Sequence, residues 1–146
     1  MVAASADTAR GAELAHNASF LLARASAVAS QRDNRALAPL GLKVRSFSVL
    51  ALALDAQPPT QREIAEFLRL DPSQVVALVD DLESRGIVAR ETDARDRRAK
   101  VVAVTDAGRA LYAEARELVA DVTTHLDAAD ASAFLRSVEQ LAFEEE

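Results

Sequence analysis

The sequence contains no cysteine, and it has only four glycines and four prolines among 146 residues. The absence of cysteine excludes disulfides, thiolate catalysis and peroxide sensing through a thiol. The two histidines, His16 and His125, lie far apart, and neither has a second ligand type at metal-binding spacing, so we expect no metal site. A glycine-rich phosphate loop is also missing. We therefore expect neither an enzyme nor a protein with a cofactor.

Long apolar runs are missing as well. No stretch approaches the roughly 18 apolar residues that span a bilayer, and the amino terminus lacks the basic start and apolar stretch of a signal peptide. Hydrophobic residues nevertheless make up 50% of the chain, which is sufficient for a core. These properties predict a soluble, cytoplasmic protein without a membrane partner, built as one domain or as a small domain with a helical extension.

The negative net charge of −6 is unevenly distributed. Residues 101–146 carry 3 basic and 10 acidic side chains, whereas residues 85–100 carry 6 basic and 3 acidic ones. Charges more than roughly 8 Å apart are largely screened at physiological salt, so binding to phosphates depends on the local surface. An acidic protein with this basic segment can bind DNA, although we expect its nonspecific affinity to be modest.

A capped helix is predicted to begin at Asp71. The Asp71 carboxylate can accept from free amides of the first turn, Pro72 stands where no amide is needed, and Gln74 can bond back to the cap. Gly86 fits the left-handed position that ends a helix. The face predicted to be buried consists of Val75, Leu78, Val79 and Leu82. The face left outside consists of Ser73, Gln74, Ala77, Asp80 and Asp81.

A β-hairpin is predicted to follow this helix. Its first strand begins at Ile87 and Val88, and the return strand covers Lys100 to Thr105, which is rich in valine and free of glycine and proline. The loop between the strands holds Arg95, Arg97 and Arg98 together with Asp93 and Asp96. Three guanidiniums at a hairpin tip favour an anionic partner.

The helix before Asp71 completes a helix-turn-helix pattern. Thr60 and Glu63 form a Thr-x-x-Glu capping box, and Ile64, Ala65 and Leu68 are predicted to face inward. A further helix is predicted from about Lys43 to Leu54. Two short helices joined by a tight turn and followed by a basic hairpin are typical of a winged helix-turn-helix.

Helices are also predicted at both ends of the chain. From Gly11 to about Leu37, small and branched residues form a seam that suggests packing against a second chain: Leu14, Ala18, Leu21, Ala25 and Val28. The carboxyl-terminal part has one apolar stripe from Leu111 to Leu126 and another from Phe134 to Leu141, split near residues 127–130, where Asp130 could cap the last helix. We expect a flexible segment at 1–10, an amino-terminal helix that packs against a second chain at 11–38, a winged helix-turn-helix DNA-binding lobe at 39–105, and carboxyl-terminal helices at 106–146.

From about Leu14 to about Phe143 the chain resembles the MarR family of bacterial transcriptional regulators. The resemblance is carried by residues 60–68 (TQREIAEFL), by residues 78–90 (LVDDLESRGIVAR), and above all by Asp96, Arg97 and Arg98 followed by Val104, Thr105 and Gly108. It implies a mainly α fold with a small β-hairpin wing, in which amino- and carboxyl-terminal helices form a homodimer. It also implies a ligand-responsive regulator, most often a repressor, that binds a palindromic operator in double-stranded DNA.

Carried over by position, the resemblance assigns DNA-binding roles to several residues. The groove-facing set is Ser73, Gln74 and Ala77, and the basic contacts are Arg95, Arg97 and Arg98 of the wing, with Arg62 as an additional contact. Asp96 would brace the wing by pairing with a nearby arginine. Positions Val76, Ala77 and Asp81 often hold threonine or a basic residue in relatives, so here the wing, together with Arg62 or Arg69, has to supply more of the affinity.

The resemblance also implies a pocket for a small phenolic or aromatic inducer between the dimerisation helices and the lobe. The candidate lining residues are His16, Phe20, Arg45 and Phe47. Arg45 has two alternative places, on the DNA side or in a pair on the surface.

Simpler interpretations remain open at this stage. The wing arginines can pair locally with Asp93 and Asp96, and the acidic residues of the 71–85 helix can form a solvated face that pairs with Arg85. Winged helices also serve as protein-interaction modules without DNA binding, which is the alternative function.

Overall fold

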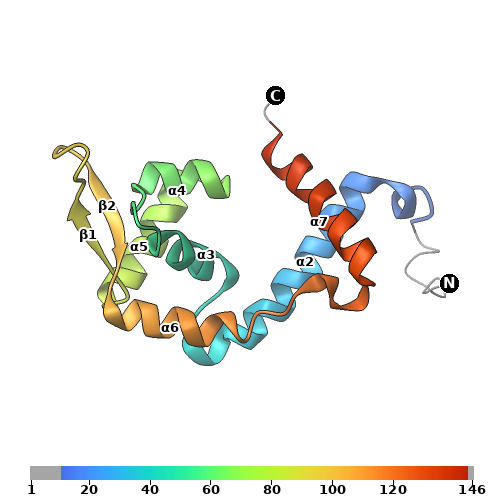
Figure 1. The fold of residues 1–146 in the computed structure, drawn as a ribbon, viewed down its shortest axis with the longest axis horizontal. Helices are drawn as coiled ribbons and strands as arrows, with labels where there is room; N and C mark the ends of the chain where they lie inside the picture. The colour runs from blue at the N-terminus through green and yellow to red at the C-terminus, as the bar shows by residue number, and fades with distance from the viewer. Residues whose placement is uncertain (1–10, 145–146) are drawn as a thin grey trace.

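The computed structural model describes residues 11–144, so the flexible segment expected at residues 1–10 lies outside the described residues. The elements follow one another as η1 (Leu14–His16), α2 (Ala18–Leu37), η2 (Ala38–Leu40), α3 (Val44–Ala53), α4 (Gln61–Leu68), α5 (Pro72–Ser84), β1 (Val88–Thr92), β2 (Lys100–Val104), α6 (Asp106–Arg116), η3 (Val122–His125) and α7 (Ala128–Phe143). The predicted fold class, mainly helical with one two-stranded antiparallel hairpin, is confirmed (Figure 1).

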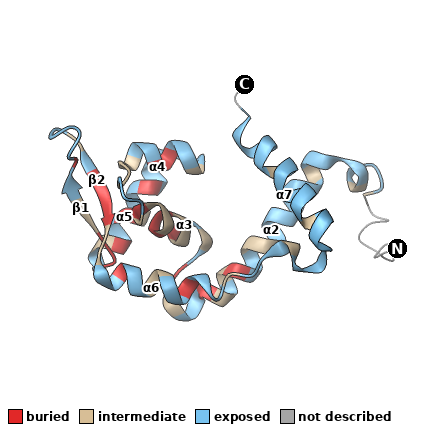
Figure 2. Cartoon of the chain, viewed as in Figure 1, coloured by how far each residue is buried: buried red, intermediate tan, exposed pale blue. Residues whose placement is uncertain are grey.

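The hydrophobic core lies in the lobe formed by α3, α4, α5 and the β1–β2 hairpin (residues 44–104). Its fully buried large side chains, with those of the adjoining residues 37–42, are Leu37, Leu42, Val49, Leu50, Ile64, Val75, Val79, Leu82, Val88 and Val102. Figure 2 shows buried residues gathered in this lobe and where α6 passes beneath it, whereas α7 is exposed along its length. The inward face predicted for α5 is therefore confirmed at Val75, Val79 and Leu82, and its outward face is left for other contacts.

No single helix among residues 11–144 has the length and apolar composition needed to cross a bilayer. Residues 18–40 and 44–53 meet that test only together, as two helical segments bent by 71°. In α3, the second of these segments, Val49, Leu50 and Ala53 are buried in the core of the lobe.

The predicted caps of the helix-turn-helix are confirmed. Thr60 Oγ1 accepts the Glu63 N–H at 3.2 Å, and the Glu63 carboxylate accepts the Thr60 N–H at 2.7 Å. Asp71 Oδ1 accepts the Ser73 N–H at 2.8 Å, while Gln74 Oε1 accepts the Asp71 N–H at 3.3 Å. Reciprocal bonds of this kind satisfy the amides that a helix start leaves unpaired, so both helices begin where the sequence predicts.

The hairpin is joined to the helix-turn-helix through its second strand. Val88 pairs with Val104 at its base and Thr92 with Lys100 near its tip. The Val102 N–H donates to the Pro59 carbonyl at 2.7 Å, directly before α4. The position of the wing is thus set by backbone hydrogen bonds to the segment that precedes α4.

The amino-terminal helix begins later than predicted. The expected helix from Gly11 is a 3₁₀ turn at residues 14–16, and α2 starts only at Ala18. Asn17 stands between them in extended conformation, and its Oδ1 accepts the Phe20 N–H at 2.9 Å. An asparagine whose side chain caps the following turn favours a new helix start over continuation of the old one.

The carboxyl-terminal helices also differ from the prediction. The helix α6 ends at Arg116, so the apolar stripe expected to continue to Leu126 does not lie on one helix. Asp121 caps a separate short turn by accepting the Thr123 N–H at 2.8 Å. The cap of α7 is Asp127 and not Asp130, because Asp127 Oδ1 accepts the Asp130 N–H at 2.9 Å. Asp130 lies within the first turn, where a negative charge is favoured by the helix dipole.

Candidate nucleic-acid interface

The outward face of α5 carries Ser73, Gln74 and Ala77, and all three are exposed. The Ser73 hydroxyl donates to the Asp71 carboxylate, and this bond, followed by the bond from the Ser73 amide, holds the pKa of Asp71 below its usual range. The hydroxyl oxygen of Ser73 still has lone pairs to accept with, while Gln74 carries both a donor and an acceptor. The face can therefore form hydrogen bonds with base edges, and it has no basic side chain of its own.

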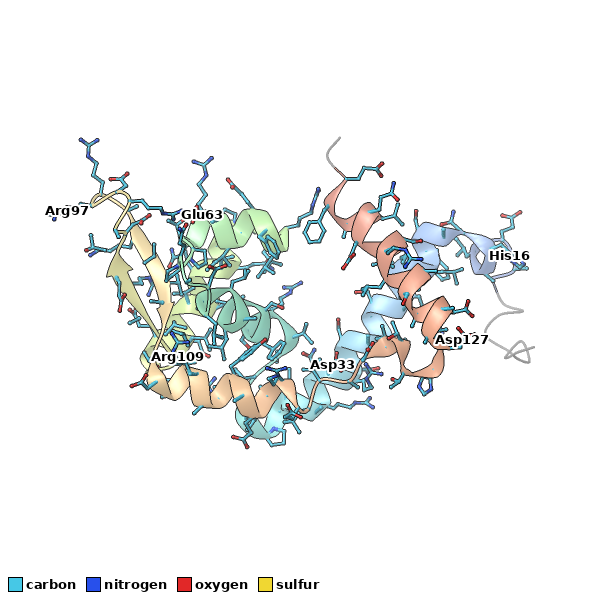
Figure 3. All side chains as sticks on the ribbon, viewed as in Figure 1. His16, Asp33, Glu63, Arg97, Arg109 and Asp127 are labelled. Atoms are coloured by element: carbon cyan, nitrogen blue, oxygen red, sulfur yellow. The ribbon has the colours of Figure 1, made fainter. Side chains whose placement is uncertain are left out.

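The wing loop holds one arginine that is paired with carboxylates and two that form no ion pair among residues 11–144. Arg95 Nε and Nη2 each lie 3.2 Å from a carboxylate oxygen of Asp93, and Arg95 Nη2 also lies 3.5 Å from Glu63. The Arg95 guanidinium is the main reason that the pKa of the buried Asp93 lies below its usual range. Arg97 and Arg98 form no ion pair with any residue from 11 to 144, and Figure 3 shows Arg97 extending from the tip of the hairpin. The positive excess of the wing therefore resides in Arg97 and Arg98.

The pairing expected for Asp96 is made by Asp93 instead. Asp96 Oδ1 accepts the backbone N–H of Arg98 at 3.0 Å, and the Asp96 carbonyl accepts the Ala99 N–H at 3.0 Å. A carboxylate two residues before an amide closes an Asx turn at the surface, so the Asp96 side chain is used locally. The bond of Arg95 to a buried carboxylate is the stronger brace of the loop.

Sequence reasoning missed Arg90, which neutralises the acidic end of α5. From β1, Arg90 forms ion pairs with Asp80 and Glu83, and its Nε donates to Gln61 Oε1 at 2.9 Å. The Arg90 backbone N–H also donates to Glu83 at 3.0 Å, which is the main cause of the lowered pKa of Glu83. One side chain thus joins α4, α5 and the wing, and it reduces the negative charge of α5.

Arg85 has a corresponding role at the end of α5. Its guanidinium donates to the carbonyls of Leu40 and Gly41 at 2.9 Å each, and it lies 3.5 Å from Asp81. The expected pairing with Asp81 is therefore present. Its two carbonyl contacts, which the sequence pattern does not predict, fix the end of α5 to the segment before α3.

Arg62 and Arg45 lie beside hollows that adjoin the outward faces of the helix-turn-helix. Arg62, 87% exposed in its side chain, pairs with Glu66 at 2.8 Å and lines a hollow of about 460 Å³ between α4 and the wing. Arg45 lines a groove of about 750 Å³ that also includes Lys43, Gln74 and Ala77. Arg45 therefore lies beside the outward face of α5.

The four residues expected to line an inducer pocket do not meet within residues 11–144. His16 is exposed in η1 at the far end of the molecule, as Figure 3 shows, and Phe20 is half-buried in the first turn of α2. Phe47 stacks on Tyr112 of α6 with ring centroids 5.3 Å apart. Because α2 carries its first residues roughly 30 Å from its last, the set expected from the first two helices is spread along the molecule.

A family model described as MarR family matches residues 40–99, which extend from η2 to the end of the wing loop. An HTH-type transcriptional repressor of Mycobacterium tuberculosis is 30% identical over 126 residues, covering 84% of this chain and 91% of the repressor. The chain belongs to the MarR family.

Solved structures of MarR-family regulators match nearly the whole chain. CouR from Rhodococcus jostii RHA1, bound to p-coumaroyl-CoA, is 38% identical with a TM-score of 0.81, over 91% of this chain and 96% of CouR. A CouR structure bound to a 23-mer DNA duplex is 35% identical with a TM-score of 0.79, over 90% and 96% of the two chains. As a MarR-family member, this chain is a transcriptional regulator and not an enzyme.

Proposed function

We propose that this MarR-family regulator acts as a homodimer that binds a palindromic operator in double-stranded DNA and represses transcription until a small ligand releases it. The observation that carries the proposal is the position of Arg97 and Arg98. Both project without a carboxylate partner, among residues 11–144, from a hairpin anchored beside the exposed face of α5. An uncompensated basic tip next to a polar helix face suits a phosphate backbone beside a major groove.

Within each lobe, α5 enters the major groove and the wing contacts the backbone or the minor groove. Gln74 can bond an adenine bidentately, Ser73 can bond a base or a phosphate, and Ala77 can contact a thymine methyl. Arg97 and Arg98 supply most of the positive charge, while Arg95 holds the loop in shape. The DNA-bound CouR structure, at 35% identity, supports this use of the fold.

The dimer is supported by apolar side chains left exposed at the end of the molecule that holds α2 and α7 (Figure 2). Those on η1, α2 and the segment from 118 to 126 are Leu14, Leu21, Leu22, Val28, Leu118, Val122 and Leu126, and those on α7 are Phe134, Leu135 and Leu141. A surface of this extent is stable in water when it is covered. A second copy covers the same surface on both partners, as a two-fold interface requires.

In the proposed regulator, a small aromatic ligand stabilises the state that has released DNA. The CouR structure that holds p-coumaroyl-CoA supports this part of the proposal. A ligand releases DNA only through a difference in affinity between two arrangements of the lobes. We propose that the ligand favours a lobe separation that does not match successive major grooves.

Binding of the purified protein to a palindromic fragment from its own promoter region tests the proposal. Fluorescence anisotropy at low salt should show saturable binding, with a scrambled fragment bound at least roughly 100-fold more weakly. Equal binding to both fragments would mean that the protein does not recognise a specific operator sequence. No binding to either fragment would favour a protein-docking role for the lobe.

A further inference from the structure

The carboxyl end of α7 contacts the lobe through one aromatic pair. Phe143 is the last residue of α7, Phe67 lies near the end of α4, and their ring centroids are 5.8 Å apart with planes tilted by 43°. This arrangement lies within the range of favourable aromatic pairs. No residue of α7 is buried, so the pair is not part of a continuous core. The pair joins two residues that are 76 positions apart in the sequence. The lobe and the helices at the other end of the molecule are also connected at a second place.

That other connection lies on the opposite side of the molecule. Asn34 of α2 accepts the N–H of Val44, the first residue of α3, at 2.8 Å, and Arg32 donates to the Ala120 carbonyl at 3.1 Å. Figure 1 shows α2 and α6 crossing on this side, whereas the ends of α4 and α7 approach each other across the open side. A contact far from the crossing restricts rotation of the lobe more than a contact beside it.

Charges at the aromatic pair are complementary. Arg69, the cap residue of α4, and Glu144, directly after α7, line the same hollow of about 520 Å³ as the two phenylalanines. Glu66 also lines it, but its carboxylate is paired with Arg62 at 2.8 Å. The lobe thus brings an arginine and a ring to this place, and α7 brings a ring and a carboxylate. Such matching favours docking of the two ends.

We propose that Phe67 and Phe143 are positioning residues that fix the angle between the lobe and α7, and through it the half-site spacing that the homodimer accepts. The proposal rests on the DNA-binding homodimer described above. Half-sites of a dimeric helix-turn-helix protein lie about one helical turn apart, roughly 34–36 Å. Rotation of each lobe about the α2–α6 crossing changes the separation of the two α5 helices, so a fixed angle selects one spacing.

Removal of the pair leaves the core of the lobe intact. Phe67 and Phe143 are 58% and 65% exposed, and neither belongs to the buried cluster of the lobe. The variant Phe143→Ala should therefore fold. A change in its DNA binding then reflects a changed position of the lobe relative to α7 and not unfolding of the protein.

The contact itself is tested without DNA. Because the chain has no tryptophan, Phe67→Trp places a single indole reporter at the contact. Acrylamide quenching should rise by up to roughly 1.7-fold when Phe143→Ala is added, since the ring that shields the indole is lost and position 67 is already 58% exposed beside it. Phe143→Leu should restore part of the shielding. Ser137→Ala serves as the control, because Ser137 is exposed on α7, lies outside the apolar dimer surface and, six positions before Phe143, faces another direction. Equal quenching with and without Phe143→Ala would overturn the contact.

The role in spacing is tested with palindromes whose half-sites are moved by one base pair in either direction. The parent protein should prefer one spacing by roughly tenfold, and Phe143→Ala should reduce this preference to threefold or less while binding to the best spacing stays nearly the same. Phe143→Leu should restore the preference. A uniform loss of affinity at all spacings would overturn the positioning role. Failure of the parent to bind any palindrome would overturn the proposed function, while the quenching result would still decide the contact.

Discussion

The backbone carbonyl of Ile87 occupies the place that a β-carbon at Gly108 would need. A β-carbon built on Gly108 would lie 2.1 Å from the Ile87 oxygen and 2.8 Å from a methyl of Val104. Thr105 brings the two segments together, because its hydroxyl bonds the Gly86 carbonyl at 2.6 Å and accepts the Gly108 N–H at 3.1 Å. The Thr-x-x-Gly pattern thus seats the start of α6 against the base of the wing.

Replacing Gly108 with alanine should therefore destabilise the protein despite the better helix propensity of alanine. The propensity gain is about 1 kcal/mol, whereas the overlap with a backbone carbonyl should lower the free energy of unfolding by roughly 2 kcal/mol net or more. Urea denaturation measures the difference. The exposed neighbour serves as control, since Ala107→Gly should cost no more than about 1 kcal/mol. A G108A protein as stable as the parent would mean that the close approach to Ile87 is not present.

Replacing Arg90 with alanine should weaken DNA binding, although Arg90 is held by protein groups. Its loss leaves Asp80 and Glu83 uncompensated on α5, the helix proposed to enter the major groove, where both would repel phosphates. We expect affinity for DNA to fall by roughly tenfold. Adding Asp80→Asn and Glu83→Gln should recover most of the loss in an anisotropy titration. The control is Arg109→Ala, which removes an exposed arginine of α6 that lies outside the proposed DNA-binding set. If the triple variant binds as weakly as R90A alone, the charge argument is wrong.

Asp93 should make the wing sensitive to acid. The Arg95 guanidinium lowers the pKa of Asp93 in the folded protein, so the pair stabilises the fold above the unfolded pKa of about 3.9 and this contribution is lost as pH falls through the folded value. In Asp93→Asn, the urea midpoint should be lower than that of the parent at pH 7, and the two should converge below pH 4 or so. In an Arg95→Ala background the substitution should have a smaller effect at pH 7, because only the bond from the backbone N–H of residue 95 to the Asp93 carboxylate remains. A gap between parent and D93N that persists at low pH would point to packing and not to ionisation.

Much of the helix-turn-helix could be predicted because its signals are local. Thr60 with Glu63, and Asp71 with Gln74, lie three residues apart, so their reciprocal bonds follow from sequence spacing alone. The cap of α7 is also a local feature, but the prediction of Asp130 is wrong, since Asp127 offers a carboxylate three positions earlier. The start of α2 after Asn17 and the end of α6 at Arg116 depend on small free-energy differences between helix continuation and a capped turn.

The partners of Arg90 and Phe143 could not be predicted in this way. Arg90 meets Gln61 from a helix 29 positions earlier, and Phe143 meets Phe67 across the open side of the molecule. A sequence pattern reports which side chains share a face of one element, but it does not report which elements face each other. For the same reason, the sequence does not show that α2 separates His16 from Phe47, two candidate pocket residues expected from the first two long helices.

The exposed apolar side chains of α2 and α7 should hold two copies together. Placing a carboxylate at Val28, 60% exposed on α2, should raise the dimer dissociation constant by roughly 30-fold or more. Light scattering over a concentration series measures the change. Val76→Glu, on the outward side of α5 and 39% exposed, adds the same charge away from this surface and should leave the dimer unchanged. A V28E protein that keeps twice the chain mass at all concentrations would contradict the assigned interface.

The salt dependence of operator binding tests the central claim most directly. Binding of the parent and of an Arg97→Ala/Arg98→Ala variant should be titrated over a series of salt concentrations, with Arg109→Ala/Arg116→Ala on α6 as a control of equal charge. Because a homodimer carries four of these wing arginines, the slope of log affinity against log salt should decrease by up to roughly 3.6 in the wing variant and remain unchanged in the control. Affinity should also fall similarly for operator and scrambled DNA. A wing variant with the slope and affinity of the parent would contradict the account.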